Sequence, residues 1–113
     1  MAGSRETSFI QIQWTCASIE EAKKICFPLV EQRKVACVSI FPQIESIYVW
    51  EGKVVASTEV KVFLKTTKER FAQIQSYILD HCSYRVPEIL VFPILDGNPS
   101  YLQWMAEATT EQT

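Results

Sequence analysis

The chain has very little glycine, a single histidine and no marked excess of charge of either sign. Its three glycines (Gly3, Gly52 and Gly97) are too few and too far apart to form a glycine-rich phosphate-binding loop. The histidine, His81, has no suitable serine motif beside it, which argues against a Ser-His-Asp hydrolase. With 11 basic and 13 acidic residues interspersed, the net charge is −2, so we expect neither a nucleic-acid partner nor an electrostatic membrane anchor.

Export and membrane segments are also missing from the sequence. The first eight residues, MAGSRETS, are polar and lack the apolar core of a secretory signal, and no apolar stretch is long enough to span a bilayer. The chain also lacks the loop-rich composition of secreted domains that are held by disulfides. We therefore expect a cytoplasmic protein with no membrane partner, whose cysteines are free thiols: Cys16, Cys26, Cys37 and Cys82.

Apolar residues, by contrast, are abundant. The 113 residues are 48% hydrophobic, which suffices for one packed domain without a disulfide or a structural metal. We predict a single domain over residues 9–108, with a polar N-terminal tail at residues 1–8 and a C-terminal tail at residues 109–113.

The first part of this domain predicts a strand and then a helix. Residues 9–15 alternate apolar and polar side chains, as a half-buried strand does. Ser18 can cap the helix that follows. Pro28 lies near the end of that helix and predicts a kink or a tightened last turn, because proline lacks the amide hydrogen that an interior helical position uses.

The middle of the chain predicts a long β-hairpin. Residues 35–41 form a second strand, which Pro42 interrupts before residues 44–50 extend it. A short connection containing glycine, at residues 51–53, then leads to a return strand over residues 54–65. The hairpin is long for a small domain, so it needs another surface to cover its apolar side chains.

The last part predicts a helix, a strand and a short helix. Thr66 and Glu69 have the spacing of a capping box before a helix. Residues 89–94 are nearly all apolar, as in a strand covered on both faces. Asn98 followed by Pro99 is a favourable start for the final helix.

The predicted order is β-α-β-β-α-β with an additional C-terminal helix, which indicates an α+β, ferredoxin-like sandwich with an extended β-hairpin. Two helices then cover one face of a four-stranded antiparallel sheet and leave the other face open. Apolar side chains nevertheless lie on both sides of the strand at residues 35–41, and Phe63 adds to them. Burial of apolar area is favourable by about 25 cal/mol per Å², so we predict an oligomer interface on the open face.

Four segments together resemble the CutA divalent-ion tolerance family. They read ACVSIFPQIESIYVWEGK, EVKVFLKTT, YRVPEILVFPI and GNPSYLQW, and the likeness extends from Phe9 to about Ala106. The resemblance implies a ferredoxin-like subunit in a tight homotrimer, with each hairpin clasping neighbouring subunits. It also implies a role in tolerance of divalent metals such as copper, without an established catalytic reaction.

The resemblance further implies a metal site. Cys16 matches a family position associated with copper binding, and His81 and Cys82 fall where family members can carry two adjacent histidines. Cys82 departs from that pattern. Because thiolate and imidazole suit Cu(I), Cu(II) or zinc, we predict weak, non-obligatory Cu²⁺ binding by Cys16, His81 and Cys82. In the alternative interpretation, both cysteines are small buried hydrophobic residues and His81 lies on the surface.

Five further residues are candidates for a cleft between subunits. The charged members can line a site for a small ligand, or they can satisfy one another as interfacial salt bridges. The cysteine and the tryptophan can equally be packed against a neighbouring subunit. The five residues are Cys37, Trp50, Glu59, Lys65 and Glu88.

Two functions of different classes remain. The first is a non-enzymatic homotrimer linked to divalent metal tolerance and to the response to metal ions. The second is a small-molecule sensor or signalling trimer similar in architecture to PII proteins, with ligands in its inter-subunit clefts. An acylphosphatase-like enzyme shares the order of elements, but the segment Cys16-Ala17-Ser18 has no arginine for an anion-binding loop.

Overall fold

The elements follow one another in the predicted order. The computed structural model describes residues 7–110, so residues 1–6 and 111–113 of the two predicted tails lie outside the described part of the chain. The elements are β1 (Phe9–Cys16), α1 (Ile19–Glu31), β2 (Cys37–Trp50), β3 (Lys53–Thr67), the short 3-10 helix η1 (Lys68–Arg70), α2 (Phe71–His81), β4 (Ile89–Pro93) and α3 (Pro99–Ala108).

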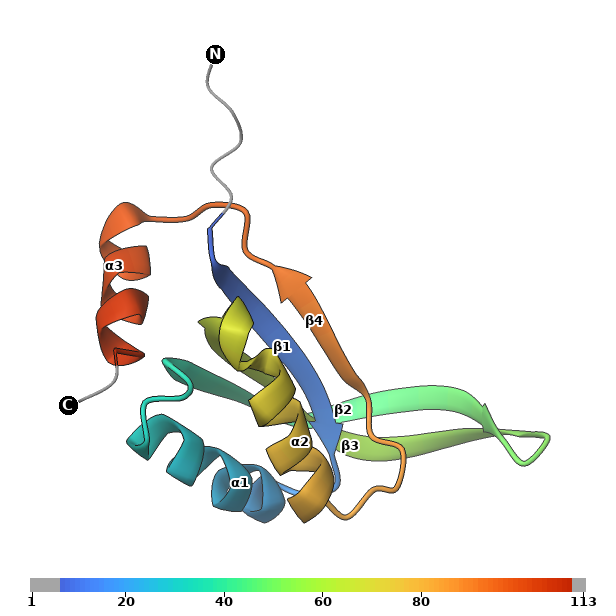
Figure 1. Ribbon diagram of the computed structural model, residues 1–113. Coiled ribbons are helices and arrows are strands. Elements are labelled where there is room, and N and C mark those ends of the chain that lie inside the picture. The colour runs from blue at the N-terminus through green and yellow to red at the C-terminus, as the bar shows by residue number, and fades with distance from the viewer. Residues whose placement is uncertain (1–6, 111–113) are drawn as a thin grey trace.

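β1 lies in the interior of a four-stranded sheet with the order β2-β3-β1-β4. It is antiparallel to β3 on one side and to β4 on the other, and β2 is antiparallel to β3. Ile12 and Trp14 are fully buried, because α1 and α2 lie over this face of the sheet (Figure 1). The same core includes Val62, Leu64, Ile74 and Ile78. The predicted ferredoxin-like arrangement is confirmed.

α1 begins and ends as its local sequence predicts. The Ser18 hydroxyl accepts a hydrogen bond from the Glu21 amide at 3.1 Å. The helix continues through Pro28 and ends in a tightened turn, in which the Arg33 amide donates to the Val30 carbonyl at 3.0 Å. Arg33 has a φ of 61°, the left-handed conformation in which helices commonly end. The tightened last turn is therefore present, and the backbone of Arg33 forms it.

The predicted capping box beginning at Thr66 is wrong. β3 extends to Thr67, because both threonines still pair with β1. The buried Thr66 hydroxyl instead donates to the Lys34 carbonyl at 2.6 Å, across 32 positions of sequence. The chain then turns into η1, whose first residue has no side-chain cap. Thr66 therefore bonds Lys34, which is distant in sequence, and does not cap the helix that follows it.

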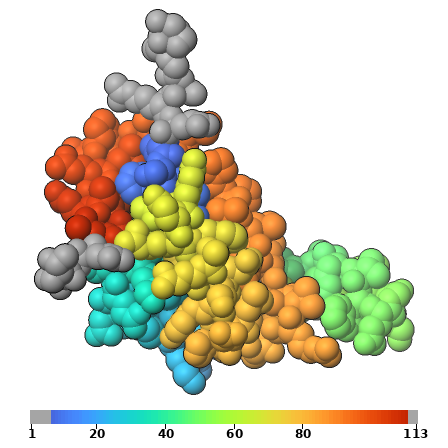
Figure 2. All heavy atoms as spheres, viewed as in Figure 1, coloured from blue at the N-terminus to red at the C-terminus, as the bar shows by residue number. Residues whose placement is uncertain are grey.

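β2 and β3 form a hairpin that projects well beyond the body of the molecule (Figure 2). β2 does not stop at Pro42; the register shifts in a bulge between Phe41 and Ile44, which accommodates a residue that cannot donate to the ladder. At the tip, Glu51 and Gly52 have φ values of 51° and 78°. Two successive positive φ angles form the kind of turn that matches the natural twist of a hairpin.

Large apolar side chains remain exposed on the hairpin and on the sheet face opposite α1 and α2. Ile47 and Val54 on the hairpin are 73% and 74% exposed. On the sheet face, Phe41 contacts Phe63 edge to face, with ring centroids 5.3 Å apart, and is itself 50% exposed. Edge strand β4 was expected to be covered on both faces, but within the single chain Leu90, Val91 and Phe92 are all exposed.

α3 closes one end of the sheet. The Asn98 side chain accepts a hydrogen bond from the Ser100 amide at 3.0 Å, and the helix starts at proline, as predicted. Met105 is buried against Phe9 and Ala36, in a second, smaller apolar cluster. Across residues 7–110, every helix is too short or too polar to cross a membrane.

Candidate functional site

The end of β1 and the loop after α2 meet at the side chain of Glu21. One carboxylate oxygen accepts hydrogen bonds from the Ala17 amide (3.3 Å) and the Ser83 hydroxyl (3.1 Å), and the other accepts from the Ser83 amide. Ala17 follows Cys16 and Ser83 follows Cys82, so a single carboxylate connects the two segments that carry these thiols. We call Cys16, Cys82 and Glu21 the thiol corner.

Both thiols of this corner are held as neutral groups. Cys16 is 1% exposed and donates to the Ser18 carbonyl at 3.5 Å, while the partly buried Cys82 donates to the Tyr84 carbonyl at 3.3 Å. Burial, the Glu21 carboxylate and the proximity of Cys82 raise the pKa of Cys16 to about 11. Burial and Glu21 also raise the pKa of Cys82. Neither thiol is a reactive thiolate at neutral pH.

His81 lies at the end of α2, next to Cys82 in sequence. Its ring contacts the Tyr77 carbonyl, whereas the Cys82 thiol contacts the Tyr84 carbonyl. Its Nδ1 lies 2.8 Å from the Tyr77 carbonyl, and its ring stacks on Tyr77 with centroids 4.2 Å apart. Because a carbonyl can only accept, Nδ1 is the donor in this contact, and Nε2 is the ring nitrogen left for another partner. Within residues 7–110, no three His, Cys, Asp or Glu side chains gather as a metal-binding group.

A second polar cluster occupies the open face of the sheet. One carboxylate oxygen of Glu88 accepts from the Thr15 hydroxyl and the Lys61 ammonium, both at 2.7 Å, and from the Gln13 amide at 3.3 Å. Partial burial favours the neutral acid, but these hydrogen bonds and the charge of Lys61 outweigh it and hold the pKa of Glu88 below its ordinary value. The cluster is therefore a charged, hydrogen-bonded site on the open face, beside the apolar side chains of Phe41 and Phe63.

The other charged cleft candidates lie along β3. Glu59 is 9% exposed and lies near Tyr84, where burial and the Glu59 carboxylate raise the pKa of the tyrosine. Lys65 pairs in register with Cys37 of β2. In this chain the ion pair of Glu88 is with Lys61 rather than with Lys65.

Cys37 and Trp50 stand at opposite ends of β2. Cys37 lies close to Tyr101 of α3, where burial and then the cysteine raise the pKa of the tyrosine. Trp50 pairs with Lys53 at the tip of the hairpin and is 59% exposed. A single chain therefore does not bring the five cleft candidates together, and their role between subunits stays a prediction.

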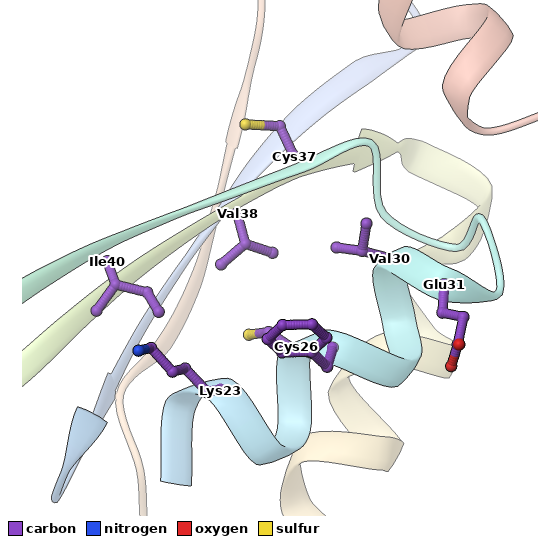
Figure 3. Close-up of a pocket in the computed structure, with 8 residues that line it drawn as sticks. Lys23, Cys26, Val30, Glu31, Cys37, Val38 and Ile40 are labelled. Carbon is purple, nitrogen blue, oxygen red and sulfur yellow. The ribbon is translucent and has the colours of Figure 1, made fainter. Parts of the chain in front are cut away.

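An apolar groove of about 520 Å³ lies between α1 and the edge strand β2. Val38 and Ile40 point into it from β2, opposite Cys26 and Val30 of α1, whereas the Cys37 side chain points to the other side of the sheet (Figure 3). The groove thus lies on the helix-covered side of the sheet, whereas the Glu88 cluster lies on the open face.

Sequence reasoning missed Glu21 and Lys61 as organising residues. The sequence alone indicates Glu21 only as an acidic residue in the first turn of a helix, because its main partner, Ser83, is 62 positions away. Lys61 could have been found, since the alternation of β3 places it on the same face as Glu59 and Lys65. The pairing of Lys61 with Glu88 depends on the register between strands, which the pattern within a single strand does not indicate.

These features define a class of protein: a ferredoxin-like α+β domain with two neutral thiols at one end of its sheet and an open face that carries both apolar and charged side chains. The chain belongs to the CutA1 divalent ion tolerance protein family, whose model matches residues 10–108. The family description names tolerance of divalent ions and no catalysed reaction.

Relatives named CutA cover most of the chain. The divalent-cation tolerance protein CutA of Thermus thermophilus is 42% identical over 95 residues, which are 84% of this chain and 92% of that protein. The chloroplastic protein CutA of Arabidopsis thaliana is 33% identical over 106 residues, 94% of this chain and 58% of that protein. The crystal structure of CutA1 from Oryza sativa is 32% identical with a TM-score of 0.87, covering 96% of this chain and 100% of that one. The resemblance stated from the sequence is confirmed.

Proposed function

We propose that the protein is a non-enzymatic homotrimer that contributes to divalent-cation tolerance and binds copper weakly. Membership of the CutA1 family over residues 10–108 supports the link to divalent ions. The observation that supports the metal-binding part is that the residues after Cys16 and Cys82, Ala17 and Ser83, both donate hydrogen bonds to the Glu21 carboxylate. Thiolate sulfur is a preferred ligand of copper, so this corner is where we place the ion.

His81 is the third candidate ligand. Its Nδ1 donates to the Tyr77 carbonyl, as one ring nitrogen does in many metal-binding histidines, which leaves Nε2 as the nitrogen that would bind an ion. The side chain is exposed, so its ring can turn to meet an ion near the surface. Bound copper would replace the thiol hydrogens of Cys16 and Cys82.

Binding should be weak and dispensable for folding. Two thiols with raised pKa values must lose their hydrogens before they can bind a metal, which lowers the net affinity at neutral pH. The core of the subunit packs around β1, α1 and α2 from apolar side chains alone. The fold therefore does not need the ion.

Assembly into a trimer is supported by the apolar surface of the single chain. Phe41, Ile47 and Trp50 are 50%, 73% and 59% exposed. Full burial of one such side chain is worth about 1.5–3 kcal/mol, so several of them together favour association strongly. An edge strand on each side of the sheet, β2 and β4, adds unpaired backbone groups that a neighbouring subunit can satisfy.

A PII-like sensor is not favoured, because the family match over almost the whole domain is to divalent-ion tolerance proteins.

We place the protein in the cytoplasm, in keeping with its four free thiols. The Arabidopsis relative is named as chloroplastic, and localisation of the full-length protein by fractionation tests this assignment.

The test of the metal site is a Cu²⁺ titration of the untagged protein against a Cys16→Ser, His81→Ala double variant. Cys37→Ser is the matched control, since it removes a thiol on the other side of the sheet. We expect thiolate-to-copper absorbance from the wild type and the control, and its loss in the double variant. Affinity should fall at low pH, because protons compete for the ligands. Equal copper stoichiometry in all three proteins would rule out these ligands.

A further inference from the structure

We propose that the apolar groove between α1 and β2 binds an unbranched, medium-chain fatty acid, with the carboxylate of the ligand on the Lys23 ammonium. The site lies on the helix-covered side of the sheet and does not depend on the proposed metal binding. The groove volume of about 520 Å³ falls within the range of about 300–1,000 Å³ that is usual for small-molecule sites.

The sequence places an apolar wall on each side of the groove. On α1, Phe27 and Val30 follow Lys23 at the four- and seven-residue spacing of a single helical face. On β2, Val38 and Ile40 are two positions apart, so both side chains point to the same side of the strand. Val38 faces Val30 across the groove (Figure 3).

Lys23 supplies the charge that would hold a carboxylate. Its ammonium is directed toward β2 beside Ile40, whereas the Glu31 carboxylate, at the other end of the groove, points away from β2 (Figure 3). Within residues 7–110 the only ion pair joins Lys61 and Glu88, so the Lys23 ammonium has no acidic partner there. A carboxylate is therefore the ligand group that complements this end of the groove.

The rest of the wall favours a plain alkyl chain. Burial raises the pKa of the Cys26 thiol to about 12, so this side chain is neutral and lines the groove as a small apolar group. A polar chain would lose its hydrogen bonds with water against such a wall, whereas an alkyl chain has none to lose. The distance along α1 from Lys23 to Val30 is about 10 Å, at about 1.5 Å per residue. An extended chain of about nine bonds, at about 1.2 Å per bond, covers that length, which matches decanoate.

The groove is not filled by the chain itself, since Phe27 and Val30 on its wall are 73% and 40% exposed. A second copy that paired its own edge strand with β2 would extend the sheet in its plane. The groove lies between that plane and α1, so such a neighbour would add a wall and leave room for the ligand. A second copy that inserted side chains into the groove would instead exclude the ligand, and the experiment separates these two cases.

The experiment is a calorimetric titration of the untagged protein with decanoate, kept below its micelle-forming concentration. Lys23→Gln removes the proposed cation. Lys24→Gln is the matched control, because Lys24 is exposed on the same helix and does not line the groove. Phe27→Ser removes an exposed part of the wall and leaves the core intact. Octanoate and decyltrimethylammonium test the chain length and the sign of the charge.

We expect one decanoate per chain, with shifted methyl signals of Val38 and Ile40 in NMR spectra and unchanged signals of Ile47 on the hairpin. Lys23→Gln should bind decanoate about two- to fivefold more weakly, which is the range of an exposed ion pair, and Lys24→Gln should bind it like the wild type. Octanoate should bind about fivefold more weakly than decanoate, since a fully buried methylene is worth about fourfold and the groove covers the chain only in part.

Equal affinity of the two lysine variants, or equally tight binding of decyltrimethylammonium, would overturn the carboxylate site. Methyl shifts on the hairpin and none in the groove would overturn its location. Absence of decanoate binding would overturn the proposal altogether. If Phe27→Ser then has a lower mass than the wild type in light scattering, the groove is occupied by a second copy of the chain.

Discussion

Glu21 and Ser83 are connected by two hydrogen bonds, although 62 positions separate them in the sequence. The serine donates from both its amide and its hydroxyl, so its position is fixed in two directions. Because Glu21 also accepts from Ala17, the first turn of α1 holds the end of β1 and the loop after α2. The fold thereby brings two cysteines from distant segments to one corner of the molecule.

Replacing Glu21 with alanine should lower the free energy of unfolding by about 1–2 kcal/mol, because three donors lose a charged acceptor at a partly exposed site. Urea denaturation measures the change. Glu20→Ala is the control, since Glu20 lies in the same first turn and shares the favourable helix dipole. Equal destabilisation by the two substitutions would mean that the bonds to Ser83 contribute nothing.

Thr66→Val should cost about 1–3 kcal/mol of stability, because it leaves the partly buried Lys34 carbonyl without the hydroxyl that now donates to it at 2.6 Å. Thermal and urea unfolding provide the measurement. Thr66→Ser keeps the hydroxyl and should cost clearly less. If the serine variant is destabilised as much as the valine variant, the methyl group and not the hydrogen bond determines the effect.

Ile47→Asp should reduce trimer formation, because it places a charge in the apolar surface that we propose to be buried between subunits. Light scattering at several protein concentrations reports the mass. Gln43→Asp introduces the same charge at an exposed polar position of β2 and should leave the mass unchanged. An Ile47→Asp protein with the mass and melting temperature of the wild type would show that this part of the hairpin stays exposed.

The Glu88 cluster should make the free energy of unfolding depend on pH in the acid range. The pKa of Glu88 lies below its ordinary value of 4.5 in the folded protein, so the unfolded chain binds a proton first as the pH falls. Its stabilising contribution is complete above the unfolded value and is lost as the pH falls through the folded value. Glu88→Gln should therefore flatten the fall in stability between about pH 5 and pH 3. An unchanged slope would show that Lys61, Thr15 and Gln13 do not stabilise the ionised form.

Local patterns predicted the order of elements and two helix starts. Ser18 and Asn98 cap α1 and α3 through partners only two or three positions away, which a single sequence can reveal. Thr66 had an equally good local pattern, yet its hydroxyl bonds Lys34, because β3 continues past it. The spacing of residues in the sequence cannot decide between a local capping bond and a bond to a distant strand or loop.

The candidate site was predictable in part. Cys16 and Cys82 were selected through the family resemblance, which has since been confirmed for the whole domain. The bridging role of Glu21 depends on how the ends of α1 and α2 pack together, and residue types alone do not indicate it. Residues proposed for a cleft between subunits, such as Trp50, depend on a neighbouring chain and stay predictions.

Native mass spectrometry of the untagged protein, before and after incubation with copper and removal of the excess ion, tests the central claim most directly. We expect an assembly of three chains that takes up one copper ion per chain, with no such uptake by a Cys16→Ser, Cys82→Ser double variant that still forms the trimer. A stable monomer at micromolar concentration, or a double variant that takes up as much copper as the wild type, would contradict the account.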